Sequence, residues 1–211
     1  MDQENIQRLS ELESEEVIFL AKDTWNKYPQ SKNELIVYEK GAETVAPKEL
    51  KLKVGAQVML TRNKLEAGWK ADFFNGNAKS SGLVNGSRGV IVAIERHGPN
   101  NLPVPIVLFD NNIQIAVYPV EWKRLSASGQ PILVREQIPL KLAWAITVHK
   151  SQGVSLSRAE VMIYNAFDYG QAYVALSRVA NMDGLWLTNP VNTRSIKAHP
   201  KVLDFYSKIS E

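Results

Sequence analysis

The sequence predicts an α/β fold in which both ends of the chain form one parallel, two-sided sheet and the middle forms a small β-barrel. Two observations lead to this prediction. In the C-terminal third, apolar strands alternate with helical patterns, which is typical of a parallel sheet covered on both faces. Between residues 83 and 125, short strands follow one another with tight turns and no helical pattern, which favours a small barrel over a large sandwich.

The N-terminal part is predicted to form a helix and then short strands. Apolar residues recur at three-residue spacing over 6–12, after Asp2, which can cap a helix. The apolar runs at 17–20 and 35–38 are typical of short strands. Alternate apolar positions within 51–63 fall on one side of an extended chain, which indicates a half-buried strand.

Residues 64–82 interrupt this regularity with Gly, Asn, Ser and Lys, and we expect a long surface loop there. The loop holds three aromatic residues, Trp69, Phe73 and Phe74. We favour the interpretation that they fix the loop to the body of the protein. The alternative is that, beside two lysines, they stack on the bases of a single-stranded nucleic acid.

The barrel is predicted from its turns and its short strands. The Asn85-Gly86 pair is a hairpin-turn signal, because both central positions of the favoured turn need positive φ. Three strands are expected, at 89–94, 104–109 and 113–118. The second and third are joined at 110–112, where Asp-Asn-Asn predicts a tight turn.

After Pro131 the chain is predicted to return to the α/β domain. We expect a strand within 132–145, buried apolar strands at 161–164 and 184–188, and helices at 169–179 and 200–209. The alternation of these helices and strands is the pattern that predicts parallel pairing.

The composition excludes several classes of protein. The 211 residues carry 25 Lys and Arg against 22 Asp and Glu, a net charge of +3, and 45% of them are hydrophobic, which is enough for a core. There is no cysteine, so disulfide scaffolds, Cys-based zinc sites and thiol catalysis are excluded. The three histidines lack metal-ligand spacing, and we expect no metal site.

The charge is unevenly distributed, because residues 1–23 are acidic and the rest of the chain is basic. A modest basic excess is compatible with a nucleic-acid partner but does not demand one. No apolar run approaches the roughly 20 residues of a membrane helix, and the N-terminus lacks the layout of a signal peptide. We therefore expect no membrane partner and an intracellular protein, in the nucleus or alternatively in the mitochondrion.

A first candidate site is the segment Thr147-Val148-His149-Lys150-Ser151-Gln152-Gly153, which we expect to start extended and turn into a helix. It offers several N–H, O–H and ammonium donors, as phosphate binding requires, and it ends at a glycine that lets backbone approach a ligand. The alternative is a capped helix start with a solvated His-Lys pair. Composition alone favours that alternative.

A second candidate is Arg178, late in a helix whose other face is apolar. One interpretation is an arginine that stabilises the helix C-terminus and pairs with a carboxylate. The other is an arginine finger, since a planar, permanently charged guanidinium can stabilise the charge that develops on a transferred γ-phosphoryl group.

The sequences of both segments are similar to motifs of a known family. LAWAITVHKSQGVSL (142–156) and GQAYVALSRVANMDGL (170–185) closely resemble the last two helicase motifs of the PIF-type (petite integration frequency) DNA helicases, relatives of RecD in superfamily one. LKVGAQVMLTRN (52–63) and GLVNGSRGVIV (82–92) resemble the connecting segments of that family, in the same order. The resemblance extends over nearly the whole chain.

This resemblance implies the C-terminal part of an ATP-dependent helicase that moves 5′ to 3′ on single-stranded DNA. It implies a second RecA-like domain of the P-loop NTPase superfamily, discontinuous over 1–62 and 131–211 and incomplete. It also implies an SH3-like barrel inserted over 63–130. ATP and Mg²⁺ would serve the parent enzyme, with single-stranded DNA and the first RecA-like domain as partners.

The resemblance also implies roles for single residues. Four of them would contact DNA: Thr147, His149, Lys150 and Ser151. Gln152 and Gly153 would lie toward the ATP, and Arg178 would be the catalytic finger that reaches its γ-phosphate. Asn85, Gly86 and Arg88 match a family segment as well. The formation of a turn already explains Asn85 and Gly86. Arg88 is either a charge on the barrel surface or a phosphate contact.

The sequence departs from the family in two ways. The stretch 64–82 is longer than the family leads us to expect, so no role is assigned to its aromatic residues. The G-x-x-x-x-G-K-[ST] pattern of a P-loop is absent, as are the acidic metal-holding motif and the first RecA-like domain. We therefore expect the chain alone to be inactive. The alternatives are a non-catalytic nucleic-acid- or protein-binding module, or a regulator that supplies Arg178 to another ATPase.

Overall fold

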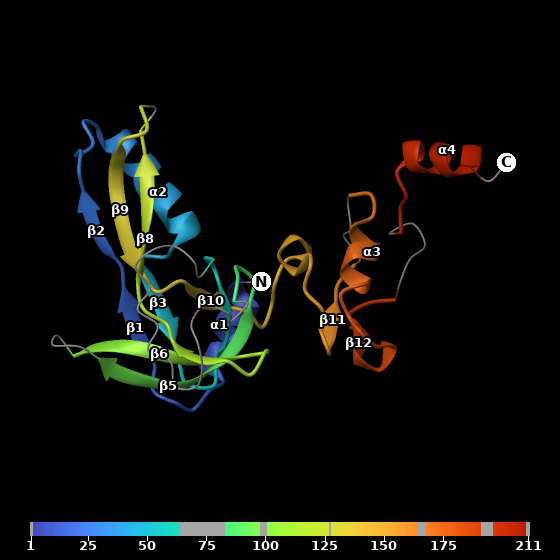
Figure 1. The fold of residues 1–211 in the computed structure, drawn as a ribbon, viewed down its shortest axis with the longest axis horizontal. Coiled ribbons are helices and arrows are strands. Elements are labelled where there is room, and N and C mark those ends of the chain that lie inside the picture. Colours follow the sequence, from blue (N-terminus) through green and yellow to red (C-terminus); the bar gives the residue numbers. More distant parts are fainter. Residues whose placement is uncertain are drawn as a thin grey trace. The chain divides into compact units, whose positions relative to one another are not determined.

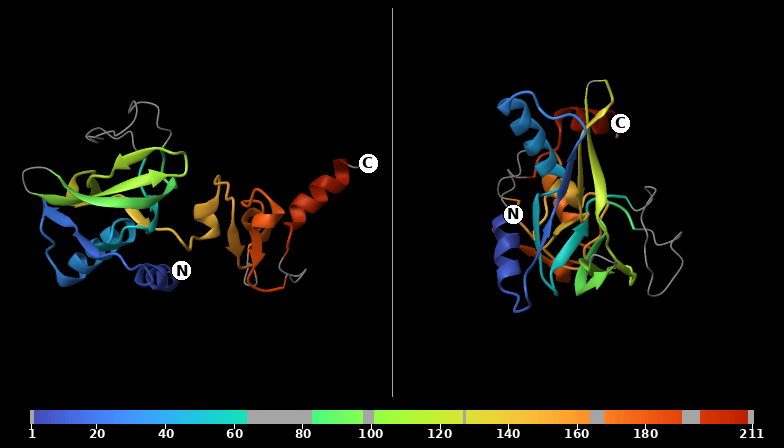
Figure 2. Two further views of the ribbon diagram at one scale, coloured as in Figure 1. Left: turned by 90° about the horizontal axis from the view of Figure 1, so that it is seen from below. Right: turned by 90° about the vertical axis from the view of Figure 1, so that its left-hand side faces the viewer.

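A computed structural model describes residues 2–63, 83–97, 101–126, 128–163, 168–190 and 196–209 (Figures 1 and 2). The chain forms two compact units, residues 1–145 and 146–211, and each is described by itself. The loop predicted at 64–82, with its aromatic residues, lies outside the described residues. Among the described helices, none is long and apolar enough to cross a bilayer.

The first unit holds two helices and ten described strands. In chain order these are α1 (Asp2–Ser10), β1 (Val17–Leu20), β2 (Lys22–Trp25), α2 (Lys32–Val45), β3 (Glu49–Leu52), β4 (Gln57–Leu60), β5 (Arg88–His97), β6 (Leu102–Phe109), β7 (Gln114–Ala116), β8 (Val120–Leu125), β9 (Pro131–Gln137) and β10 (Leu140–Leu142). The second unit holds η2 (Val148–Ser151), β11 (Ala159–Val161), α3 (Gln171–Leu176), η3 (Met182–Gly184), β12 (Leu185–Leu187) and α4 (Pro200–Ile209).

The strands of the first unit form three antiparallel sheets. The largest has the order β10-β4-β5-β6-β7, the second β2-β9-β8, and the third pairs β1 with β3. Among the described strands no sheet closes on itself. The three strands predicted between 89 and 118 are confirmed as β5, β6 and β7, but they share their sheet with β4 and β10. These two strands lie outside the 63–130 range expected for the insertion.

The core of the first unit follows the two-residue period of these strands. Alternate residues such as Val107 and Phe109 of β6, and Ile115 and Val117 beside them, turn to one face and are almost fully buried. Leu9 of α1 packs into the same cluster, which confirms the predicted N-terminal helix. Val104, Ile106 and Ala116 form a second, smaller buried cluster, so residues on both faces of this sheet are buried.

The strand predicted at 35–38 is wrong, because these residues lie inside α2. The helix begins with a variant of the capping box: the cap Ser31 hydroxyl accepts the Glu34 N–H at 3.2 Å, and the Glu34 carboxylate accepts the N–H of Gln30, the residue before the cap, at 2.8 Å. The reciprocal bonds satisfy backbone donors that the first turn would otherwise leave free. Local capping therefore outweighs the strand preference of the apolar run.

Turn chemistry was predicted in part. Gly86 has a φ of 99° but Asn85 has no positive φ, so the turn exists without the mirror-image hairpin form. Its Val84 carbonyl accepts the Ser87 N–H at 2.9 Å. The turn at 110–112 is confirmed, with Asn112 at φ 62°. The single strand expected within 51–63 is instead β3 and β4, separated by a turn at Gly55, whose φ is 89°.

Parallel pairing is confirmed only in the second unit. There β11 pairs with β12, and Leu156 and Val179 form a parallel bridge. The strand predicted at 184–188 is confirmed as β12, but Trp186 and Leu187 face solvent. The strand predicted at 161–164 is displaced, because β11 ends at Val161, and the residues of β11 are not buried. The helices α3 and α4 are confirmed, and α4 buries none of its residues within the described chain.

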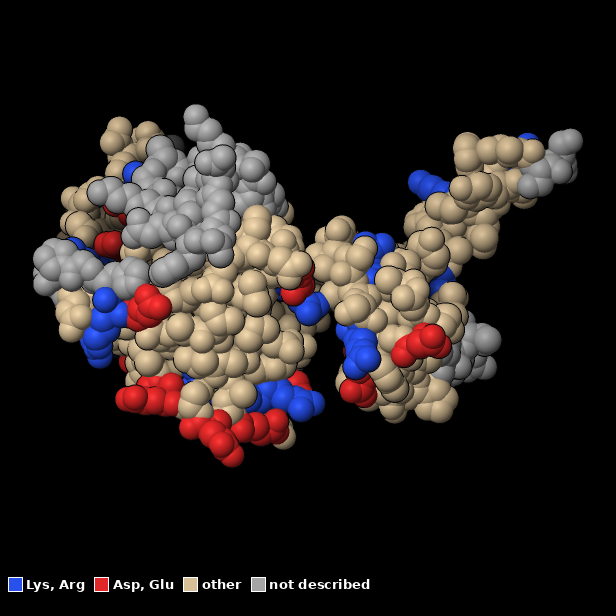
Figure 3. All heavy atoms as spheres, turned by 60° about the horizontal axis from the view of Figure 1, so that its bottom comes forward, with Lys and Arg blue, Asp and Glu red and all other residues tan. Residues whose placement is uncertain are grey.

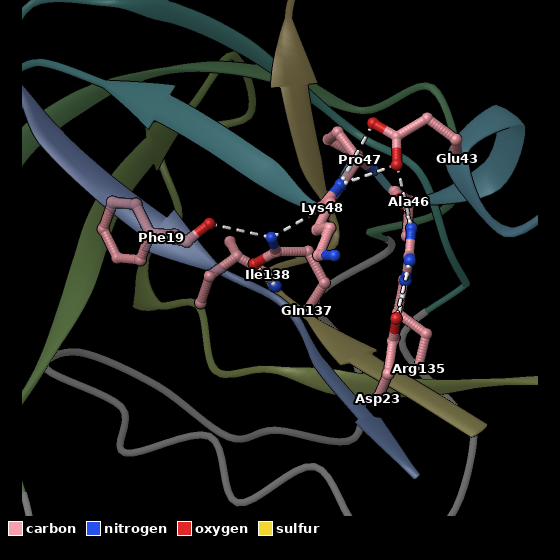
Figure 4. A network of polar contacts seen from close by, with 9 residues as sticks. All are labelled: Phe19, Asp23, Glu43, Ala46, Pro47, Lys48, Arg135, Gln137 and Ile138. Atoms are coloured by element: carbon pink, nitrogen blue, oxygen red, sulfur yellow. Dashed lines mark hydrogen bonds and ion pairs between the residues drawn. The ribbon is translucent and has the colours of Figure 1, made fainter. Parts of the chain in front are cut away.

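A buried polar network in β9 holds the first unit together (Figure 4). The Arg135 side chain is 2% exposed and donates to both carboxylate oxygens of Asp23, at 2.7 and 2.8 Å. It also donates to Glu43 at 3.0 Å and to the Ala46 carbonyl at 2.9 Å. These bonds, led by those to Asp23, raise the pKa of Arg135. One guanidinium thus joins β2, α2 and β9.

Candidate nucleic-acid and nucleotide site

The first candidate segment folds as a short 3₁₀ helix, η2, that starts at a threonine cap. Thr147 is extended, with φ −73° and ψ 154°, and its hydroxyl accepts the Lys150 N–H at 3.2 Å. Its carbonyl accepts the Ser151 N–H at 3.1 Å. The predicted change from extended chain to helix is confirmed, and it follows from ordinary N-cap chemistry.

The turn of η2 separates its side chains into two groups. Val148 packs into a small apolar cluster, and Ser151 is buried with its hydroxyl donating to the Val148 carbonyl at 2.7 Å. His149 and Lys150 are exposed. The Ser151 hydroxyl is therefore engaged inside η2, whereas the two basic side chains are accessible to a ligand.

Gln152 and Gly153 lead the chain out of η2, and both are exposed. Gly153 has a φ of 77°, and a Cβ placed on it would meet nothing within 4 Å. This left-handed backbone explains why the residue is glycine, because residues that carry a side chain rarely adopt it. The space around it is open.

Arg178 follows α3, and its guanidinium folds back on the end of that helix. Nε donates to the Val174 carbonyl at 3.0 Å, and Nη2 donates to the Ser177 hydroxyl at 3.0 Å. In the described part of the chain no carboxylate forms an ion pair with it. Both acceptors are neutral: the Val174 carbonyl fits the helix-end part of the first interpretation, but the carboxylate partner that it also expects is not seen among the described residues.

The two motifs meet through the backbone of the second unit. The Leu156 N–H donates to the Arg178 carbonyl at 2.7 Å, and the Ala180 N–H donates to the Leu156 carbonyl at 2.9 Å. A shared apolar cluster lies beneath them, made of Val148, Val161, Ile163, Ala172, Ala175 and Leu176. The segment that begins at Thr147 and the segment that ends at Arg178 are thus parts of one packed structure.

Sequence reasoning missed Gly184, which makes this junction possible. A Cβ on Gly184 would clash with the Ser157 carbonyl oxygen, approaching it more closely than any side chain tolerates. The glycine therefore lets the chain before β12 approach the chain before β11. The signal was present in the sequence, as a glycine directly before an apolar strand.

The residues of the barrel segment lie in the first unit. Arg88 is half-buried, with Nε 3.9 Å from a carboxylate oxygen of Asp110. The Asn63 side chain accepts the Asn85 N–H at 2.9 Å, which fixes the turn at Gly86 to the end of β4. These contacts fit the structural interpretations of Asn85 and Arg88.

Among the described residues of the second unit, neither charges of one sign nor potential metal ligands form a cluster. Figure 3 shows acidic side chains grouped on the first unit, whereas both charges lie interspersed on the visible face of the second. The N-terminal stretch of the first unit carries exposed glutamates, such as Glu13 and Glu15. Within the described ranges, no three His, Asp or Glu side chains converge as metal ligands.

Comparison with known proteins identifies the family. No protein-family model matches the chain. Over 207 residues, 98% of the chain, it is 37% identical to the ATP-dependent DNA helicase PIF1 of Xenopus laevis. The crystal structure of Pif1 helicase from Candida albicans is similar over 99% of the chain, with a TM-score of 0.73 and 30% identity. Pif1 helicase from Bacteroides in complex with ADP-AlF3 and ssDNA is similar over 99%, with a TM-score of 0.67 and 26% identity.

These relatives are longer than the chain. It spans 28% of the Xenopus protein, 47% of the Candida chain and 42% of the Bacteroides chain. The similarity nevertheless covers both units, with their mixed sheets, and both motifs. The resemblance of the motifs is confirmed, and by homology over nearly its whole length the chain belongs to the family of PIF1 ATP-dependent DNA helicases.

Proposed function

We propose that the chain is the C-terminal part of an ATP-dependent 5′-to-3′ DNA helicase. It forms a second RecA-like domain and contributes single-stranded DNA contacts and an arginine finger. The observation that carries this proposal is the backbone pairing of Leu156 with Arg178 and Ala180, because it joins a phosphate-binding segment to a candidate finger. The antiparallel sheet around β5 and β6 is the part that we assign to the inserted SH3-like barrel.

The DNA contacts are assigned to η2. His149 and Lys150 are exposed side by side, and Thr147 sits at the cap, so their donors can converge on a phosphate. Ser151 is a weaker candidate because its hydroxyl is already bound to Val148. A Bacteroides relative is known in complex with ssDNA, which supports this class of ligand.

The nucleotide contacts are assigned to Gln152, Gly153 and Arg178. A guanidinium held by a carbonyl and a hydroxyl can exchange these neutral acceptors for a phosphate, since charge-assisted bonds are roughly twice as strong. The same relative binds ADP-AlF3, which supports use of ATP by the family. An arginine locked onto a carboxylate would lack this freedom.

Productive ATP binding needs groups that this chain does not supply. The sequence has no P-loop lysine, and the described residues hold no cluster of metal ligands. We propose that the first RecA-like domain provides both, with Mg²⁺, and that the chain alone binds without hydrolysing ATP. Acting alone, the chain would then serve as a non-catalytic binding module, the alternative named from its sequence.

The DNA assignment is tested by binding labelled oligothymidine to the full chain at several salt concentrations. We expect affinity to fall steeply with salt. Lys150→Ala should weaken binding and reduce the slope of log affinity against log salt by about one, as the loss of one phosphate contact would. Lys201→Ala, an exposed lysine of α4, is the matched control. Equal salt slopes for the Lys150 variant and the unmodified chain would contradict the assignment.

A further inference from the structure

Three aromatic rings gather at one end of the three-stranded sheet in the first unit. Trp25 is the last residue of β2, Tyr28 follows it, and Tyr38 comes from α2. The ring of Trp25 lies 5.6 Å from that of Tyr28 and 6.3 Å from that of Tyr38, with interplanar angles of 52° and 63°. The cluster is not part of the core, because Tyr28 is 69% exposed.

The strand register places an arginine beside the rings. Trp25 lies opposite Leu133 of β9, and Leu133 lies opposite Arg124 of β8, so all three side chains share the face that α2 covers. The guanidinium of Arg124 lies against α2 at Gly41, where a Cβ would come within 2.8 Å of it. A glycine in the helix therefore makes room for a cation at the cluster.

Two cations, Lys27 and Arg124, lie near the cluster, and α2 adds carboxylates, among them that of Glu34. Neither Lys27 nor Arg124 forms an ion pair with a carboxylate in the described part of the chain. Residues 24–33 and 122–135, which build this end of the sheet, contain no Asp or Glu. The carboxylate of Glu34 interacts with the charge of Lys27 and is itself engaged by the Gln30 N–H and by the Tyr38 hydroxyl at 3.0 Å.

We propose that Trp25, Tyr28 and Tyr38, flanked by Lys27 and Arg124, form a second contact site for single-stranded nucleic acid. Bases stack on accessible aromatic rings, and cations beside the rings attract the phosphates between the bases. The combination of one exposed ring, two half-buried rings and two nearby cations suits a polyanion with flat, apolar groups. The site goes beyond the proposed function, which places DNA on η2 of the other unit.

The test measures binding of the full chain to a labelled oligothymidine of about 16 nucleotides. We expect Tyr28→Ala to weaken binding on the order of tenfold, and Tyr28→Phe to bind as the unmodified chain does, because the ring and not the hydroxyl stacks. Tyr206→Ala removes an equally exposed tyrosine of α4 and is the matched control. Tyr28 is exposed, so its loss leaves the fold intact, and circular dichroism checks this.

Photocrosslinking separates this site from that on η2. With 5-iodouracil in the oligonucleotide, we expect labelled peptides that contain residues 25–28. Labelling confined to 147–153, or a Tyr28→Ala variant that binds normally, would overturn the inference and leave the proposed function standing. Labelling confined to 25–28 would support the inference while contradicting the DNA role of η2.

An acidic peptide is the competing occupant, since it would also be attracted by the two cations. The nucleic-acid assignment would be overturned by a glutamate-rich peptide that binds the full chain and is not displaced by oligothymidine, provided that Tyr28→Ala weakens the binding of that peptide. Displacement of such a peptide by oligothymidine would support it.

Discussion

The side chain of Asn5 and the backbone of Ala145 hold each other through two hydrogen bonds. Asn5 Nδ2 donates to the Ala145 carbonyl at 3.0 Å, and the Ala145 N–H donates to Asn5 Oδ1 at 2.9 Å. Asn5 is 6% exposed, so neither backbone group has easy access to water. The pair fixes α1 to the last residue of the first unit, two residues before the cap of η2.

We predict that Asn5→Ala lowers the free energy of unfolding of the first unit by about 2–3 kcal/mol, because both backbone groups of Ala145 lose their partner. Asn5→Asp should lose as much at neutral pH, since a carboxylate cannot donate to the Ala145 carbonyl. A protonated carboxyl can donate, so the pKa of this Asp would be raised in the folded state. Urea unfolding should therefore show the variant recovering relative to the unmodified chain as pH falls. Parallel pH curves would contradict the two-bond geometry.

A second prediction concerns the network of Arg135. In Asp23→Ala the buried guanidinium keeps only Glu43 and the Ala46 carbonyl as partners. We expect the free energy of unfolding to fall by about 3–5 kcal/mol. The control is Glu16→Ala, which breaks an exposed ion pair with Lys51 and should cost at most about 1 kcal/mol. Chemical denaturation measures both. Similar losses for the two variants would show that the buried pair is not the main contact between β2 and β9.

Gly184→Ala should disrupt the junction between the two motifs. Its Cβ would meet the Ser157 backbone, which cannot move aside as a side chain can, so we expect a loss of about 3 kcal/mol or more. Gly153→Ala is the comparison, because it strains only its own φ, at about 1–2 kcal/mol. Hydrogen exchange at the Leu156 and Ala180 amides reports the junction directly. Unchanged protection in the Gly184 variant would refute the prediction.

The capping box of α2 predicts a pH dependence. The Gln30 N–H, and then the Tyr38 hydroxyl, lower the pKa of Glu34. A pKa that is lower in the folded state stabilises the fold at neutral pH, and that contribution is lost as pH falls through the folded value. We expect Glu34→Gln to remove this part of the acid sensitivity in urea unfolding. An identical loss of stability at low pH in both proteins would contradict it.

The role proposed for Arg178 is testable in a helicase completed by the first RecA-like domain. We expect Arg178→Ala to bind DNA normally but to hydrolyse ATP on the order of 10³-fold more slowly. Arg178→Lys should rescue only weakly, because an ammonium lacks the planar fork of the guanidinium. DNA-stimulated ATPase assays measure the effect. Unchanged activity would leave Arg178 with its helix-end contacts to Val174 and Ser177 as its whole role.

The parts of the fold that the sequence predicts well are those with a strong local pattern. The apolar run that includes Val107 and Phe109 identifies a strand, and Thr147 identifies the start of η2. The apolar run at 35–38 misled, although Ser31 and Glu34 carried a capping signal. Arg135 could not be recognised as buried, because its partner Asp23 lies 112 residues away. The antiparallel pairing of β4 with β10 and of β2 with β9 is likewise non-local.

The pairing of β2 with β9 has a consequence for synthesis on the ribosome. Asp23 meets Arg135 only after a further 112 residues have been translated, about 6–20 s later at typical rates. During that interval β2 remains an open edge that other nascent chains can join. Folding of the first unit is thus expected to wait until β9 has been made.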